Sequence, residues 1–234
     1  MFRTVMVFAV IVAMGGAAVA KTAYPAMAPI AQYGMKQADE VALARSAAPP
    51  SLASGAGVMV LGAHGYKTVA KSTNGFVCIV ERAWASGVKE VEFWNPKLRG
   101  PLCLNPAAAR SVLPAYLERT QWVLGGATRE EIERRVRASV AAGHYVLPET
   151  GAMSFMLAKG GYLCDAAGGP WHPHLMFFLP AAAGGPDSWG ANLAGAPLVA
   201  SIDPVEPVTT FFIPVAKWSD GTSDRGLSAS EMHM

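Results

Sequence analysis

Five consecutive apolar residues, Phe-Val-Cys-Ile-Val at positions 76–80, constrain the fold more than any other stretch of this chain. The side chains of a β-strand alternate between the two faces of a sheet, so a strand of this composition must be covered on both faces. We therefore predict a central strand at residues 76–82. Asn74 and Gly75 before it are typical of a tight turn, and residues 66–72 alternate between polar and apolar, which predicts a hairpin of these two segments.

Strand and helix patterns alternate in blocks along the rest of the chain. Strand composition recurs at residues 57–62, 152–158, 174–180 and 208–216, and helical composition at residues 35–48, 107–124 and 129–142. Pro114 should kink the second helix, and Thr128 with Glu131 forms a capping box at the start of the third. Strands on both sides of a helical middle predict an α+β fold, with a mixed or antiparallel sheet of about five to six strands packed against two to three helices in a single domain.

The first twenty residues have the pattern of an export signal. Arg3 precedes an unbroken apolar run that ends in small residues, which predicts a signal peptide cleaved after Ala20 and a periplasmic or secreted protein. Residues 21–57 then form an extended lead and a helix, residues 58–216 a globular α+β domain, and residues 217–234 a flexible tail. No later apolar stretch is long enough to span a membrane.

Charge and cysteine content narrow the classes of partner. Lys and Arg total 19 and Asp and Glu total 17, so the chain offers no basic surface for nucleic acid. Three cysteines would meet an oxidising compartment after export. We favour a disulfide between Cys78 and Cys103, with Cys164 left as a thiol; the alternative is that Cys78 is a small buried apolar residue.

Two histidines two residues apart, His172 and His174, stand at the start of the strand predicted at 174–180. Side chains at i and i+2 share a face of a strand, so the pair could bind a divalent metal such as zinc. Asp165 or His64 could supply a third ligand and leave a position for an activated water. The alternative is that both histidines form the polar end of a core strand, because the chain has no His-Glu-x-x-His or paired Cys-x-x-Cys motif.

Other residues could also contribute to a site. Glu81 ends the predicted central strand and, in a cleft beside the histidines, would be a general base; an ion pair at the sheet end is the simpler role. No Gly-x-Ser-x-Gly motif is present, and Asp165 beside Cys164 opposes thiolate formation. The tryptophans could line a binding groove or pack in a core. The chain has six of them: Trp84, Trp94, Trp122, Trp171, Trp189 and Trp218.

Four segments together resemble a family of exported bacterial proteins of unknown function. They are NGFVCIVERAW, FWNPKLRGPLCLNPAAARSVLP, GAMSFMLAKGGYLCDAAGGPWHPHLMFFLP and PVTTFFIPVAKWSDGT. The resemblance implies a single domain over residues 58–216 and carries no activity or site residue. The sequence as a whole predicts a non-catalytic protein that binds an envelope component or an unknown small molecule. The alternative is a metal-assisted hydrolase built on His172 and His174.

Overall fold

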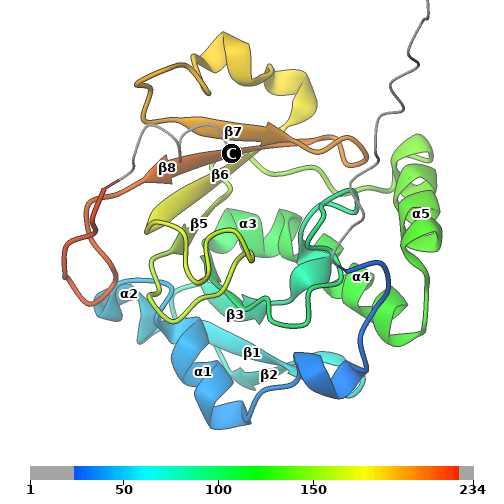
Figure 1. Ribbon diagram of the computed structural model, residues 1–234, viewed down its shortest axis with the longest axis horizontal. Coiled ribbons are helices and arrows are strands. Elements are labelled where there is room, and N and C mark those ends of the chain that lie inside the picture. The colour runs from blue at the N-terminus through cyan, green and yellow to red at the C-terminus, as the bar shows by residue number, and fades with distance from the viewer. Residues whose placement is uncertain (1–23, 227–234) are drawn as a thin grey trace, which may run out of the picture.

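The structure is a computed structural model that describes residues 24–226 (Figure 1). The predicted signal peptide, with its cleavage site after Ala20, lies outside the described residues, as does the end of the predicted tail at residues 227–234.

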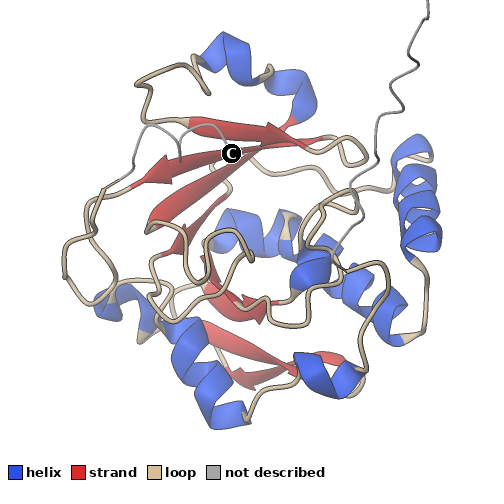
Figure 2. Ribbon diagram, viewed as in Figure 1, coloured by secondary structure: helices blue, strands red, loops and turns tan. Residues whose placement is uncertain are grey.

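One mixed eight-stranded sheet organises the described chain (Figure 2). Its order is β2-β1-β3-β4-β5-β6-β8-β7, and every neighbouring pair is antiparallel except β1 with β3. The strands are β1 (Gly57–Gly62), β2 (Gly65–Ala70), β3 (Val77–Glu81), β4 (Gly100–Leu104), β5 (Met153–Met156), β6 (His174–Pro180), β7 (Val199–Ile202) and β8 (Val208–Pro214). The predicted α+β class and mixed sheet are confirmed.

The predicted strand number was too low because two strands carry weak signals. β4 contains Pro101, and proline is unusual inside a sheet because it cannot donate a ladder hydrogen bond. It nevertheless lies between β3 and β5, and all five of its residues are buried. β7 is four residues long and pairs with β8 at the sheet edge.

The hairpin predicted around Asn74 and Gly75 was wrong. β2 pairs with β1 through a two-residue turn at Ala63 and His64, and β3 lies on the other side of β1, parallel to it. The Asn74 side chain donates to the Leu52 carbonyl (2.8 Å), and the Thr73 N–H bonds the Gly55 carbonyl (2.8 Å). These bonds hold the segment between β2 and β3 beside the end of α2 (Pro50–Ala53). The chain therefore crosses to the other side of β1 before β3 begins.

Helices cover both faces of the sheet beside β3, as its apolar sequence requires. α1 (Gln37–Arg45) and α2 contribute to one apolar cluster with Val58, Cys78 and Val80. α3 (Pro106–Ser111) and α4 (Leu113–Leu124) contribute to another with Ile79 and Leu102, on the opposite face (Figure 1). The helix predicted at 107–124 is thus interrupted at Val112, one residue before α4 begins.

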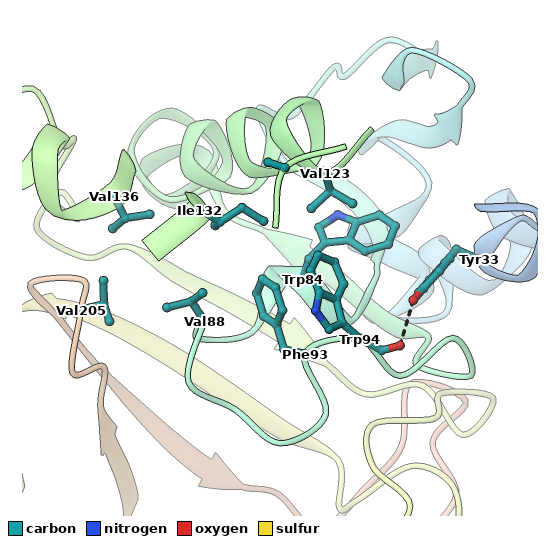
Figure 3. Close-up of a cluster of buried hydrophobic side chains, with 10 residues drawn as sticks. Tyr33, Trp84, Val88, Phe93, Trp94, Val123, Ile132, Val136 and Val205 are labelled. Carbon is teal, nitrogen blue, oxygen red and sulfur yellow. Dashed lines mark hydrogen bonds between the residues drawn. The ribbon is translucent and has the colours of Figure 1, made fainter. Parts of the chain in front are cut away.

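A third apolar cluster joins α4 and α5 (Arg129–Ala141) to the loop after β3 (Figure 3). The rings of Trp84, Phe93 and Trp94 lie in it, and the Tyr33 hydroxyl donates to the Trp94 carbonyl (2.8 Å). The Thr128 side chain caps α5 by accepting the Glu131 N–H, as predicted. Short 3₁₀ turns complete the chain: η1 (Ile30–Tyr33), η2 (Ala83–Ala85), η3 (Ala181–Ala183) and η4 (Pro186–Trp189).

A buried ion pair attaches the N-terminal helix to the sheet. Arg82 donates to Glu40 of α1 (2.8 Å) and to the Tyr33 carbonyl (2.7 Å), and both charged side chains are 1% exposed or less. Arg82, the residue after β3, therefore forms an ion pair at this end of the strand. Its partner Glu40 belongs to the helix predicted at residues 35–48.

The predicted disulfide between Cys78 and Cys103 is confirmed. The two residues face each other across β3 and β4, and Cys164 is the free cysteine. Within residues 24–226, no helix is long and apolar enough to cross a membrane.

Candidate functional site

A cavity of about 260 Å³ lies where β3 ends and β6 begins. We call it the loop-lined cavity, because residues 157–173, which connect β5 to β6, contribute part of its wall. Its polar lining is Glu81, His174 and Cys164, and its main apolar lining is Met156, Leu163, Trp171, Met176 and Phe212. The structure therefore brings two of the predicted candidates, Glu81 and His174, to one cavity.

Strand register explains this convergence. Ile79 of β3 pairs with Leu102 of β4, and Met156 of β5 pairs with His174 of β6. All four side chains lie on the same face of the sheet. Glu81 lies two residues beyond Ile79 and so points to the same face. That face is the one on which α3 and α4 pack, and the cavity occupies the end of it that the helices leave uncovered.

Glu81 is partly buried, and its side chain lines the cavity. Within the described chain its carboxyl group has no hydrogen-bond donor or cation partner. Burial raises its pKa to about 8, although Arg119 acts in the opposite direction. The carboxyl is therefore mostly protonated at neutral pH and can donate a hydrogen bond into the cavity. The ion pair that the sequence suggested for Glu81 is not present among the described residues.

The backbone opposite Glu81 leaves room for its side chain. Gly100 pairs with Glu81 across β3 and β4, and a Cβ atom at position 100 would lie 2.5 Å from the Glu81 Cγ. Such a distance is far shorter than a carbon–carbon van der Waals contact. Gly100 is thus required for the observed position of the Glu81 carboxyl.

His174 is buried, at 2% exposed, and neutral. Its Nδ1 lies 2.6 Å from the His172 carbonyl oxygen, which can only accept, so Nδ1 carries the proton. Burial lowers the His174 pKa to about 4. The remaining ring nitrogen, Nε2, then holds the lone pair in the neutral form.

His172 contacts a residue that the sequence placed in the tail. Its Nδ1 lies 2.5 Å from an oxygen of Asp224, and the Trp171 ring packs edge-on against both His172 (5.5 Å between centroids) and His174 (5.1 Å). The beginning of the segment predicted to be flexible therefore packs against the start of β6. No local spacing could have indicated Asp224, which is 52 residues from His172.

The two residues expected as third metal ligands lie elsewhere. His64 is exposed in the turn between β1 and β2, and four strand spacings separate β1 from β6, about 19 Å. The Asp165 carboxylate accepts from Tyr24 (2.6 Å), Tyr162 (2.6 Å) and Lys97 (2.5 Å) at the surface, and these contacts, Lys97 first, hold its pKa well below the usual range.

Ligand groups for a metal are not assembled in the part of the chain that the structure describes. Across residues 24–226, no three His, Cys, Asp or Glu side chains are grouped to hold a metal ion. Cys164 does line the loop-lined cavity, but its sulfur accepts from the Ala167 N–H and has no recorded bond to His174. The histidine–thiol hydrogen bond of a cysteine nucleophile is thus not among the described contacts.

A second cavity, of about 140 Å³, adjoins the first and shares Glu81, Met176 and Phe212 with it. We call it the acidic cavity, because Asp203 and Glu206 also line it, together with Tyr116 and Tyr145. A larger apolar groove of about 540 Å³ lies nearby against Trp189, which is 51% exposed. Of the tryptophans considered for binding, Trp84 and Trp94 are core residues, whereas Trp171 and Trp189 line concave surfaces.

No family model, curated protein or solved structure matches this chain. The family resemblance drawn from the sequence stays a prediction.

Proposed function

We infer that this protein is an exported, non-catalytic binding protein for a small molecule that carries one ring or a hydrocarbon chain of similar size. The observation that carries the proposal is the loop-lined cavity, in which Trp171 and Phe212 accompany two polar groups, Glu81 and His174, that are neutral at pH 7. Ligand sites typically combine an apolar wall with a few placed polar groups. An engineered apolar cavity of about 150 Å³ binds benzene, so about 260 Å³ accommodates a substituted ring.

The polar groups specify complementary ligand atoms. A protonated Glu81 donates a hydrogen bond, and the neutral His174 accepts at Nε2 or leaves that atom in apolar contact. Export is supported by the disulfide between Cys78 and Cys103, since such bonds persist in oxidising compartments. A metal-assisted reaction has no comparable support, because the ligands that it would need are not grouped in residues 24–226.

Saturation-transfer NMR with 2-phenylethanol tests the proposal. The purified protein should transfer saturation to the ring protons of this neutral probe. Cys164→Phe, which fills the cavity, should abolish the transfer. Ala166→Phe is the matched control, because Ala166 is exposed on the same loop and lines no described cavity. Equal transfer in both variants would contradict the assignment of the cavity as the binding site.

A further inference from the structure

The acidic cavity has three carboxyl groups in its wall and no basic side chain. Glu81, Asp203 and Glu206 line it, whereas none of its lining residues is Lys, Arg or His. It shares Glu81, Met176 and Phe212 with the loop-lined cavity, so the two cavities adjoin at these side chains. The two cavities thus combine an apolar part with an acidic part.

One of the three carboxylates, that of Glu206, is already paired with a cation outside the cavity wall. Glu206 forms an ion pair with buried Arg119 and accepts a hydrogen bond from the Tyr145 hydroxyl (2.7 Å). Arg119 is itself fixed by the carbonyls of Trp84 (2.9 Å) and Ser86 (2.7 Å), so it has little freedom to serve another carboxylate.

The other two carboxyl groups have no cation within ion-pair distance among the described residues, although Arg119 acts on both, and Arg137 on Asp203, through charge. Asp203 accepts the backbone N–H groups of Val205 and Glu206 (both 2.7 Å) through one oxygen, and Glu81 has no polar partner among the described residues. Neither group forms an ion pair within residues 24–226. Burial is the largest cause of a raised pKa at both groups, as expected for carboxyls that lack a counterion.

We propose that the ligand is a small organic cation, with its ring or hydrocarbon body in the loop-lined cavity and a protonated amine in the acidic cavity between Glu81 and Asp203. This inference rests on the proposed function and names the ligand class for the same site. An ammonium group has three donors, which two carboxylates and the Tyr116 hydroxyl of the acidic cavity can accept. A metal ion would need a tighter ligand group than the described residues provide.

Binding of such a cation should release a proton. Glu81 is mostly protonated at pH 7, and an adjacent ammonium favours the ionised carboxylate. The titratable or charged groups that line the two cavities with Glu81, or interact with it through charge, are Tyr66, Tyr116, Arg119, Tyr145, Cys164, His174, Asp203 and Glu206. Of these, Arg119 lowers the Glu81 pKa and is already paired with Glu206.

Calorimetry with 2-phenylethylamine and 2-phenylethanol separates the two proposals. Titrations at pH 7 in two buffers of different ionisation enthalpy should show at least tenfold tighter binding of the amine and release of about one proton per amine bound. Glu81→Gln should remove the proton release and reduce the preference for the amine to less than threefold, while the alcohol still binds. Glu130→Gln, on the exposed face of α5, should behave as the unaltered protein.

Each outcome has a defined meaning. Equal affinity for both probes, or an amine preference that Glu81→Gln leaves intact, would overturn the cation proposal and leave the small-molecule site standing. Binding of neither probe would overturn both proposals. Melting curves of the variants would show that each is folded, so a loss of binding reports on the site.

Discussion

Glu81 and His174 are the polar residues that most define the loop-lined cavity, and both are neutral at pH 7 for the same physical reason. Burial disfavours the charged form, which raises the pKa of an acid and lowers that of a base. A cavity lined in this way is polar without carrying net charge. It can therefore hydrogen-bond a ligand at little electrostatic cost.

Protonation of His174 should couple stability to pH. Its pKa is about 4 in the folded protein and about 6.5 unfolded, so the unfolded chain binds the extra proton between these values. The contribution of His174 is complete above pH 6.5 and falls by roughly 3 kcal/mol as the pH drops to 4. Urea denaturation of wild type and His174→Gln at pH 7 and pH 4 measures it by difference.

The titration of Glu81 changes the free energy of unfolding with pH in the opposite direction to that of His174. The comparison of wild type with His174→Gln is needed to separate the two effects. Its folded pKa of about 8 lies above the unfolded value, so its effect is to make stability fall as the pH rises from about 4.5 to 8. A stability difference between wild type and His174→Gln that is the same at both pH values would show that His174 does not titrate as described.

Gly100 should control the position of Glu81. In Gly100→Ala the new Cβ meets the Glu81 side chain, which must leave its buried position, at a cost of about 1–3 kcal/mol. The Glu81 pKa should then fall from about 8 toward the ordinary value for glutamate. A carbon-13 NMR titration of the glutamate carboxyl groups measures this change.

Gly169→Ala is the matched control for Gly100. Its added Cβ would meet nothing within 4 Å. An unchanged Glu81 titration in Gly100→Ala would mean that the strand pair does not fix the carboxyl.

At the scale of elements, β3 ends at Glu81 in the cavity wall and is joined to β4 by the Cys78–Cys103 disulfide. The bridge closes a sequence separation of 25 residues, for which the loss of unfolded-state entropy is worth about 3 kcal/mol. We expect the double variant Cys78→Ala with Cys103→Ala to lose stability of this order in urea denaturation. Cys164→Ser, which alters only the free thiol, should lose less than 1 kcal/mol; equal losses would contradict the assigned pairing.

Elements with strong local signals could be predicted from the sequence, and elements defined by distant partners could not. The apolar run at 76–80 predicted a central strand, and Thr128 predicted the start of α5, because burial and capping are local requirements. β4 was missed because a proline strand is recognisable only once its neighbours are known. The hairpin was misassigned because contacts with Leu52 and Gly55 determine the path after β2.

The candidate site, too, could be predicted only in part from the sequence. The sequence identified Glu81 and His174 individually, as residues at the ends of apolar strands. Their shared cavity depends on the sheet order, in which β4 and β5 lie between β3 and β6. Asp224 and Asp203 reach the region from the C-terminal part of the chain, and no motif links them to the histidines.

At the scale of the whole molecule, the proposed binding site occupies one end of one sheet face. Helices α3 and α4 cover the middle of that face, and the loop before β6 covers the end that carries Glu81 and His174. The ion pair of Glu40 with Arg82 attaches α1 to the end of β3, and the disulfide joins β3 to β4. The fold thus lines the cavity with paired strands on one side and with the loop at residues 157–173 on another.

A crystal structure of the protein grown with 2-phenylethylamine tests this account most directly. The account predicts electron density for the ring in the loop-lined cavity, in contact with Trp171 and Phe212, with the amine nitrogen within about 3 Å of a carboxyl oxygen of Glu81. Density for the probe in the groove beside Trp189, with the loop-lined cavity empty, would contradict it.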